Sequence, residues 1–346
     1  MTTLITGSSG FVGLALTEEL LRMGNHVVGF DTISPSSHAL DVFAALPGKF
    51  WYRVGDVRDP STIEAALSSH QCENLVTLAA VTADESRERR QPGLIYEVNV
   101  AGTLNAIEVA TRYGVSRFVH LSSGSVYGKS GYAGTALNET NTPVQPEGLY
   151  GHSKHAAEIA VLRLKSLHAI DLVIGRLGTC FGPWEHDTGF RDTLSAPLQI
   201  LKLAQSGQTA ILPRDSVRDW LYVRDAAAGI FSLIKTRQLP HSIYNIAAGF
   251  EFPLSYWCQK LQAHMPGFQW RIPKTGEPCN VHLYGSRDRA SMDIGRLLAD
   301  TRFKPSYDLD TAFDDFISWK MAIENKRTSN EPFKQGTPFH EDTGQF

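Results

Sequence analysis

The pattern that most restricts the fold of this chain lies at its start. Residues 1–6 predict a first strand, and the glycine-rich segment 7–13 follows directly. Residues 14–23 then predict an apolar helix, and residues 26–30 predict a second buried strand that ends at Asp31. This order of strand, glycine turn, helix, strand and acid is typical of a doubly wound parallel sheet with helices on both faces.

The glycines of this turn suit the binding of a dinucleotide. Gly7, Gly10 and Gly13 allow the backbone to turn tightly and approach a pyrophosphate, and the following helix offers free N–H groups and a positive dipole end. Asp31 stands where a carboxylate bonds the ribose hydroxyls of adenosine. Because such an acid repels a 2′-phosphate, we predict NAD rather than NADP. The other residues of the turn that we expect to contact NAD are Ser9, Phe11 and Val12.

A second pattern predicts acid–base chemistry. Tyr150 and Lys154 are one helical turn apart and share a helix face, and Ser123 directly follows an earlier predicted strand, 117–122. A phenol is a poor base at neutral pH, but a neighbouring cation favours its ionised form and lowers its pKa. Such a phenolate can take the proton of a secondary alcohol, and the Ser123 hydroxyl can bond the same oxygen. We therefore predict Ser123, Tyr150 and Lys154 as the catalytic set.

With these motifs, the chain resembles the extended short-chain dehydrogenase/reductase family, in its NAD-dependent sugar epimerase/dehydratase branch. The resemblance runs from residue 2 to about residue 320. It rests on the following segments: Thr6-Gly7-x-x-Gly10-x-x-Gly13, Gly55-Asp56-Val57-Arg58-Asp59, Leu78-Ala79-Ala80, Asn99-Val100-Ala101-Gly102-Thr103, Ser123 with Tyr127, Tyr150 with Lys154, and Arg218 to Asp225.

The resemblance implies an architecture and a cofactor site. It implies a Rossmann sheet in residues 1–178, to which parts of 215–250 return, and a smaller C-terminal α/β substrate lobe in 179–323. Residues 324–346 are polar and predict a C-terminal arm. The resemblance also implies that Lys154 bonds the nicotinamide ribose. Its further implied NAD contacts are Asp56, Val57, Leu78, Ala79, Ala80 and Asn99. It further implies a homodimer in which the helices 93–112 and 150–168 pair into a four-helix bundle.

The residues after Ser123 bear on the reaction. The 4,6-dehydratases of the family carry an Asp-Glu pair there, and decarboxylases carry a Glu near the same place. This chain has Gly124 and Ser125, which disfavours both reactions. We predict an epimerase of nucleotide sugars that oxidises the sugar transiently, with a sugar or sugar-acid dehydrogenase that releases NADH as the alternative. A non-catalytic NAD sensor is a third reading, which the intact catalytic set disfavours.

Several residues are candidates for substrate binding. UDP-sugar epimerases have an asparagine where this chain has Thr179, which weakens the nucleotide-sugar prediction without removing it. The loop 184–192 matches no familiar version of the family and supplies Arg191, a guanidinium suited to an anionic sugar. The remaining candidates are Ser123 and its neighbour Ser125, Arg218, which matches a phosphate-binding position, and Arg287 or Arg289 from a later loop.

Composition is that of an ordinary globular enzyme. A net charge of -3 gives no electrostatic case for binding nucleic acid or an anionic membrane, and no apolar run is long enough to span one. The first strand begins almost at Met1, so we expect no signal peptide and a cytoplasmic location. The four cysteines are scattered and predict reduced thiols, and His152 with His155 lacks further ligands, so we expect no metal site.

Overall fold

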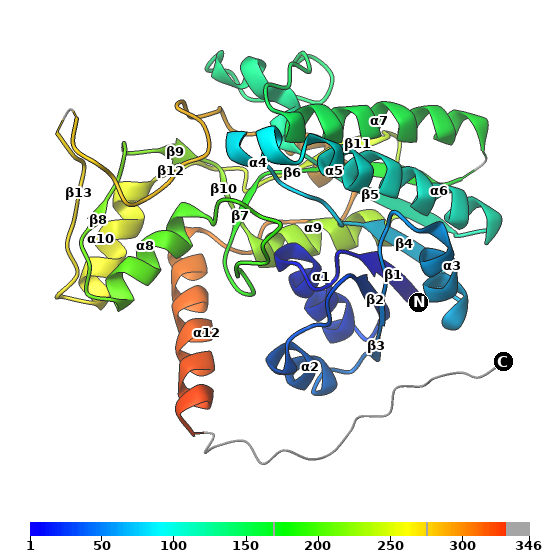
Figure 1. Cartoon of the computed structure of the whole chain (residues 1–346), viewed down its shortest axis with the longest axis horizontal. Helices are drawn as coiled ribbons and strands as arrows, with labels where there is room; N and C mark the ends of the chain where they lie inside the picture. The colour runs from blue at the N-terminus through cyan, green and yellow to red at the C-terminus, as the bar shows by residue number, and fades with distance from the viewer. Residues whose placement is uncertain (169, 275, 330–346) are drawn as a thin grey trace.

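In the computed structural model, the centre of the protein is a seven-stranded, fully parallel sheet with the strand order β11-β6-β5-β4-β1-β2-β3 (Figure 1). The structure describes residues 1–168, 170–274 and 276–329, and only the backbone of 324–329. The strands are β1 (Thr2–Thr6), β2 (His26–Asp31), β3 (Phe50–Val54), β4 (Asn74–Thr77), β5 (Arg117–Ser123), β6 (Leu172–Leu177) and β11 (Ile243–Ile246). The fold class predicted from the sequence is confirmed.

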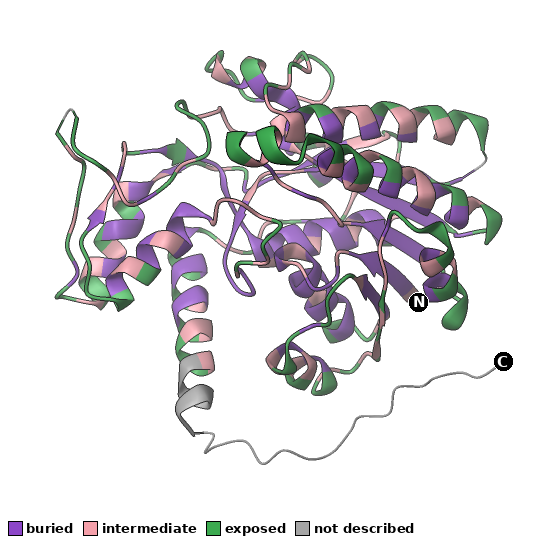
Figure 2. Ribbon diagram, viewed as in Figure 1, coloured by how far each residue is buried: buried purple, intermediate pink, exposed green. Residues whose placement is uncertain are grey.

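Helices cover both faces of this sheet, which explains why its central strands are buried on both sides (Figure 2). On one face lie α1 (Phe11–Arg22), α2 (Ser37–Ala44) and α9 (Val223–Lys235). On the other lie α3 (Pro60–Ser69), α6 (Gly102–Arg112) and α7 (Leu149–Leu167). Local sequence sets the helix starts, as in α3, where Asp59 caps the first turn and Pro60 occupies its first position.

The order of the strands fixes the place of the site. The chain runs outward from β1 to β3 on one side and from β4 to β11 on the other, so connections leave β1 and β4 in opposite directions. A crevice opens at the carboxyl ends of two such neighbouring strands. The glycine-rich turn follows β1 there, and Ser123 ends β5 one strand beyond β4, in register with Leu177 of β6.

One helix differs from its prediction. The sequence predicted a continuous helix over 93–112, but the structure has α5 (Pro92–Tyr96), a π-helical turn η1 (Glu97–Ala101) and then α6, with a short helix α4 (Glu85–Arg90) before them. A π-turn adds a residue to the helix and rotates the side chains around it. Here it directs the Asn99 side chain toward the backbone of Val81, to which it bonds through both its amide nitrogen and its oxygen.

A smaller lobe follows the sheet in the chain and has its own apolar core, which includes Phe181, Trp257 and Phe316. It lies to the left of the sheet in Figure 1. Three short pairs of strands link its helices: β7 (Thr179–Phe181) with β10 (Trp220–Tyr222), β8 (Ala210–Ile211) with β13 (Trp270–Arg271), and β9 (Val217–Arg218) with β12 (Phe252–Pro253). Its helices are α8 (Ala196–Gln205), α10 (Leu254–His264) and α12 (Leu309–Ser329).

Three remaining features complete the architecture. The 3-10 segment η2 (Gly124–Tyr132) follows β5, and the short helix α11 (Gly295–Asp300) packs near β11. Helix α12 continues past the predicted start of the C-terminal arm, so the backbone of 324–329 is helical. Residues 330–346 of the predicted arm lie outside the described residues.

Candidate active site

A single cavity of about 330 Å³ joins the glycine-rich turn, the predicted catalytic residues and the lobe. From the predicted NAD set, its wall contains Gly7, Gly10, Phe11, Val12, Gly13, Leu78, Ala80, Tyr150 and Lys154. From the predicted substrate set, it contains Ser123, Ser125, Thr179, Arg191 and Arg218. Segments that are far apart in the sequence therefore meet around one space, as the strand-end argument predicted.

The glycine-rich turn has the shape that a pyrophosphate requires. Gly7 has φ +73°, and a Cβ atom there would lie 2.6 Å from the backbone nitrogen of Ala79. A Cβ atom at Gly13 would lie 2.2 Å from the carbonyl oxygen of Gly7. Side chains are thus excluded where the turn packs against the start of α1, and the backbone is open toward the cavity. The residues present fit a dinucleotide.

Asp31 lies beside this turn at the end of β2. Its carboxylate accepts hydrogen bonds from the backbone N–H groups of Ser9 (3.0 Å) and Thr32 (2.7 Å). Burial raises the pKa of Asp31, and these backbone hydrogen bonds oppose that rise. Ser9 and Asp31 are not in the cavity wall but next to it, where the adenosine end of a bound NAD would extend.

Four other predicted NAD contacts also lie outside the cavity wall. Asp56 is ion-paired with Arg58 at 2.6 Å, Val57 is buried, and Ala79 packs behind Gly7. Asn99 is placed differently from the prediction: it is fully buried, and both amide hydrogens are used, by the Val81 carbonyl (3.0 Å) and the Ser153 hydroxyl (2.9 Å). Its side chain therefore holds the segment after β4 against α7 and positions the site from outside.

Tyr150 is the second residue of helix α7, and its hydroxyl lies next to that of Ser123. Burial raises the pKa of Tyr150, while a hydrogen bond with Ser123 and the positive charge of Arg191 lower it. The Ser123 hydroxyl also accepts the backbone N–H of Ser125 at 3.1 Å, which fixes its direction. The sequence suggested that Lys154 lowers the pKa of Tyr150. In the structure, the cation that lowers this pKa is Arg191.

Lys154 has a different electrostatic setting. It is 3% exposed, and its ammonium group donates no hydrogen bond to any residue that the structure describes. Burial lowers its pKa to about 8, and the negative charge of Glu158 opposes that change. The charge of Lys154 acts instead on buried His120, whose pKa is lowered first by burial and then by this cation. A buried ammonium without an acceptor suits the ribose hydroxyls of a nicotinamide nucleotide.

The two positions after Ser123 carry no acid, and a side chain at Gly124 would have to displace the side chain of Met292. A Cβ atom at Gly124 would lie 2.7 Å from the sulfur of Met292, which comes from a distant loop. The Ser125 hydroxyl is buried and has no hydrogen-bond partner among the described residues. Because Ser125 also lines the cavity, its free hydroxyl is available to a bound molecule.

The arginines are divided differently from the prediction. Arg218 lies in the cavity wall, bonded to Asp288 (3.0 Å) and to the Tyr284 carbonyl (2.9 Å). Arg287 stacks over the Tyr132 ring at 4.5 Å and is not in the wall. Its neighbour Arg289 is in the wall and donates to the Gly124 carbonyl at 2.7 Å. Packing in this irregular loop, and not the sequence, separates Arg289 from Arg287.

Sequence reasoning missed Asp219 as a site residue. It is 7% exposed, lines the cavity, and accepts the backbone N–H of Met292 at 2.9 Å. Burial raises its pKa to about 6, and the Met292 hydrogen bond and the charge of Arg289 oppose that rise. In the sequence, Trp220 and Tyr222 after it alternate as in a packed core, so Asp219 was not recognised as a site residue. In the structure, it lies in the cavity wall beside Met292.

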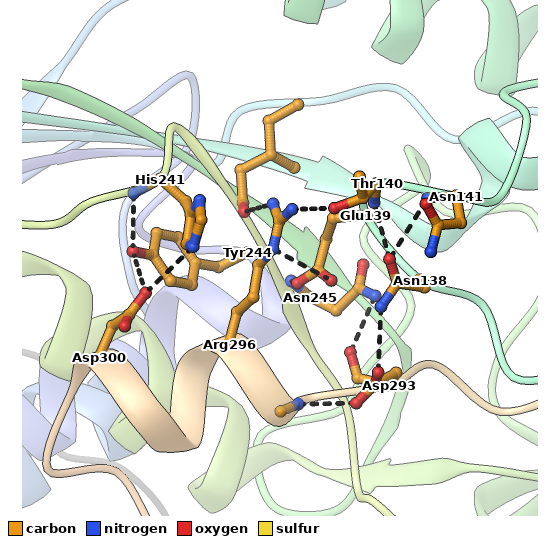
Figure 3. Close-up of polar contacts among 12 residues, drawn as sticks. Asn138, Glu139, Thr140, Asn141, His241, Tyr244, Asn245, Asp293, Arg296 and Asp300 are labelled. Carbon is orange, nitrogen blue, oxygen red and sulfur yellow. Dashed lines mark hydrogen bonds and ion pairs between the residues drawn. The ribbon is translucent and has the colours of Figure 1, made fainter.

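A polar network surrounds Asn245 of β11 (Figure 3). The Asn245 amide nitrogen donates to the carbonyls of Leu137 (2.9 Å) and Asp293 (3.0 Å), and its oxygen accepts the Tyr127 hydroxyl at 2.8 Å. The Glu139 carboxylate accepts the backbone N–H of Asn245 at 2.8 Å. Leu137 and its pairing neighbour Met292 both line the cavity, so this network fixes part of the wall.

With the geometry established, comparisons with known proteins identify the family. The pattern of the NAD dependent epimerase/dehydratase family matches residues 3–247. The chain belongs to the NAD-dependent epimerase/dehydratase family. NAD is the cofactor of this family, and the glycine turn, Asp31 and the buried Lys154 fit it.

Individual relatives differ in the reaction that their names give. The chain is 26% identical over 339 residues to a dTDP-glucose 4,6-dehydratase of Xanthomonas campestris, with 93% of each chain covered. It is 31% identical over 228 residues to sterol demethylase protein B of Methylococcus capsulatus, covering 66% of this chain and 64% of that one. A UDP-glucose 4-epimerase of Thermotoga maritima, solved with UDP-glucose, shares the fold at a TM-score of 0.77 and 20% identity, covering 94% and 100%.

Two further observations concern membrane-spanning helices and metal sites. Throughout the part of the chain that the structure describes, no helix is long and apolar enough to cross a membrane. Within the same residues, no three His, Cys, Asp or Glu side chains gather in a way that suits a metal ion.

Proposed function

We propose that this member of the family is an epimerase of nucleotide sugars. The observation that carries the proposal is the composition of the cavity wall. Ser123, Tyr150 and Lys154 share that wall with the glycine-rich turn, whereas Gly124 and Ser125 supply no carboxyl group. The site thus contains what is needed to oxidise and reduce an alcohol reversibly, and lacks an acid at the place from which elimination is assisted.

Each residue of the set has one task in this reaction. Tyr150, as phenolate, accepts the hydroxyl proton of the sugar and later returns it. Ser123 bonds the same oxygen and stabilises the charge that develops there. When bound, NAD supplies the acceptor for the hydride of the reacting carbon. Lys154 holds the ribose next to that carbon and keeps positive charge near Tyr150. The keto sugar then turns over in the cavity and is reduced on its other face.

Two arginines suit the nucleotide part of such a substrate. Arg218 and Arg289 both line the cavity on the side of the lobe. Arg218 already pairs with Asp288, which fixes its guanidinium in place. Arg289 has no ion pair among the described residues and donates only to the backbone of Gly124. We assign the diphosphate of the substrate to this pair, since planar guanidinium groups bind phosphate oxygens well.

A 4,6-dehydratase reaction is the second candidate, favoured by the names of relatives and by Asp219. The Asp219 carboxyl contacts Met292, whose sulfur in turn abuts Gly124, so an acid lies close to the position where dehydratases carry one. Its raised pKa, about 6, allows it to donate a proton near neutral pH. We rank this reaction below epimerisation because Asp219 is held by a backbone hydrogen bond at the far side of Met292.

A dehydrogenase that releases NADH is the third candidate. It is favoured by Thr179, which lines the cavity where nucleotide-sugar epimerases have an asparagine. Free sugars and sugar acids carry no diphosphate and make no use of Arg218 and Arg289, which is the reason for ranking this reaction lower.

The test is an activity panel with the purified protein. UDP-, GDP- and dTDP-sugars, and free sugars and sugar acids, are each incubated with NAD and followed at 340 nm and by proton NMR. We expect a new epimer of one nucleotide sugar without net NADH, and no product with Tyr150→Phe. Stoichiometric NADH from a free sugar contradicts the proposal in favour of the dehydrogenase. A 4-keto-6-deoxy product that disappears in Asp219→Asn contradicts it in favour of the dehydratase.

A further inference from the structure

The loop 184–195, which we call the strap, crosses the cavity between the sheet and the lobe. At its start, Trp184 adopts φ +69°, which is unusual for a residue other than glycine, and its indole donates to Glu18 of α1 at 2.6 Å. At its end, Asp192 pairs with Arg87 of α4 at 2.6 Å. In between, the Phe190 carbonyl accepts the backbone N–H of Thr82 at 3.1 Å. The strap is therefore tied to three separate elements.

The strap holds one guanidinium in a fixed position. The Glu185 side chain is fully buried, and its carboxylate accepts the backbone N–H and the hydroxyl of Ser195 at 2.6 and 2.5 Å. The same carboxylate lies 2.9 Å from Nη1 of Arg191, and Nε of Arg191 donates to the Thr193 carbonyl at 3.1 Å. Nη2 of Arg191 donates no hydrogen bond to any residue that the structure describes. A buried anion thus orients an arginine that keeps a free pair of donors.

This arginine lies at the reacting end of the cavity. Its guanidinium stands 5.3 Å from the ring centre of Phe11, at the start of α1, and Arg191 shares the cavity wall with Tyr150 and Cys180. Its charge lowers the pKa of Tyr150 and of Cys180, against the effect of burial on each. Arg218 and Arg289, by contrast, lie with Asp288, Tyr284 and Gly124 on the side of the lobe.

We infer that Arg191 binds a carboxylate that the substrate carries close to its reacting carbon, so that the preferred substrate is an acidic nucleotide sugar. This inference rests on the proposed function and adds the class of sugar to it. Glu185 pairs with this guanidinium through Nη1, and among the described residues Nη2 has no acceptor, so it can donate to a carboxylate oxygen of the substrate. Asp192 is paired with Arg87, and both oxygens of Glu185 are already bonded to Ser195.

The diphosphate of NAD is the other anion within reach of this part of the cavity. The glycine turn and the start of α1 already provide for it with backbone N–H groups, which is the reason to assign Arg191 to the sugar. The two assignments differ in what a substitution of Arg191 changes. Binding to the sugar affects the preference between acidic and neutral substrates, whereas binding to the diphosphate affects the affinity for NAD.

The test compares UDP-glucuronate with UDP-glucose, which differ only in whether carbon 6 is a carboxylate. Dissociation constants of both are measured by calorimetry on the NAD-loaded protein, for wild type, Arg191→Gln, Arg191→Lys and Arg287→Gln. We expect wild type to prefer UDP-glucuronate, and Arg191→Gln to reduce that preference about 10- to 100-fold. Arg191→Lys keeps the charge but loses the planar guanidinium, so we expect its preference for UDP-glucuronate to lie between those of wild type and Arg191→Gln. Arg287→Gln, which removes an arginine from outside the cavity, should leave the preference unchanged.

A pH profile with UDP-glucose gives a second readout that a merely structural role does not move. Activity appears as Tyr150 loses its proton, so removal of the Arg191 charge shifts the acidic limb of kcat/KM to higher pH. Cys180 and Tyr284 also act on Tyr150, and both raise its pKa, so neither compensates for the lost cation. Thermal unfolding of each variant checks that the strap remains folded.

The possible outcomes distinguish an error in the role of Arg191 from an error in the proposed epimerase function. If UDP-glucose is bound and epimerised but Arg191→Gln leaves the preference unchanged, the inference about Arg191 is wrong while the proposed function stands. An unchanged preference together with weaker NAD binding assigns Arg191 to the cofactor. If wild type converts neither UDP sugar nor any nucleotide sugar of the activity panel, the proposed function fails, and the inference fails with it.

Discussion

Lys154 depends on a second buried charge one helical turn further along α7. Glu158 is 1% exposed and forms a bidentate ion pair with Arg176 of β6, with N···O distances of 2.9 and 2.7 Å. Burial alone would raise the pKa of Glu158, but the hydrogen bonds of Arg176 and His155 hold it below its usual value, so Glu158 stays ionised. This anion keeps the Lys154 pKa from falling further than about 8.

We therefore predict that Glu158→Gln shifts the alkaline limb of kcat/KM to lower pH. Activity requires the Lys154 ammonium and is lost as pH rises through its pKa, and the substitution removes the charge that raises that pKa. The variant also leaves Arg176 unpaired, so we expect a loss of about 3–5 kcal/mol of stability by urea unfolding. The matched control is His152→Gln on the exposed side of the same helix, which should leave the limb in place. An unmoved limb in folded Glu158→Gln contradicts this account of Lys154.

At the scale of elements, the two ends of helix α1 allow a comparison of two glycines, Gly7 before the helix and Gly24 after it. Gly7 and Gly24 have nearly the same positive φ, +73° and +74°, but a Cβ atom at Gly24 meets nothing within 4 Å. Gly24→Ala should thus cost only the backbone strain, about 1–2 kcal/mol. Gly7→Ala adds the clash with Ala79 and displaces the N–H groups of the turn. We expect NAD affinity, measured by calorimetry, to fall at least about tenfold in Gly7→Ala and to stay unchanged in Gly24→Ala.

The network on β11 predicts a second effect at this scale. Asn245→Ala leaves the Tyr127 hydroxyl and the carbonyls of Leu137 and Asp293 without their partner in a buried region. We expect a loss of about 2–4 kcal/mol in the free energy of unfolding, measured with urea. The control is Asn141→Ala, an exposed asparagine two residues after Glu139, which should change stability by less than about 0.5 kcal/mol. Equal effects of the two substitutions would show that the network contributes little.

The elements that could be predicted from the sequence were those with a local signal. Strand β1, the glycine turn, α1, β2 and α7 follow from runs of apolar residues and from turn residues, and the structure has them within a few positions. The π-turn at Asn99 was missed because it depends on the carbonyl and N–H of Val81, a tertiary contact. The strap was recognised only as unusual, since its anchors Glu18, Arg87 and Thr82 are distant in sequence.

The site divides in the same way. Ser123, Tyr150 and Lys154 were predicted from their spacing and from their position after the glycine-rich turn, and all three lie in one cavity wall. Asp219 was missed, and Arg287 and Arg289 were left as alternatives, because the direction of a side chain in an irregular loop is set by packing. The electrostatic role of Arg191 on Tyr150 has no sequence signal, because the two residues come together only through the fold.

For the whole molecule, we propose that two copies pair through α6 and α7. These helices lie side by side over one face of the sheet (Figure 1), and Ile159 of α7 is 57% exposed. Burial of such apolar side chains against a second copy is the usual driving force of association. We expect a dimeric mass in light scattering at micromolar concentration and a monomeric mass for Ile159→Glu. The control is Leu298→Glu, an exposed leucine on α11, which should remain dimeric.

The central claim is that the protein oxidises a sugar at one carbon and returns the same hydrogen to that carbon. The most direct test is conversion of a nucleotide sugar that carries deuterium at carbon 4, with NAD-loaded protein and proton NMR of the product. The account predicts an epimer that retains deuterium at carbon 4, no accumulated NADH, and no product from Tyr150→Phe. Deuterium found at carbon 6 of a 4-keto product, or in released NADH, would contradict it.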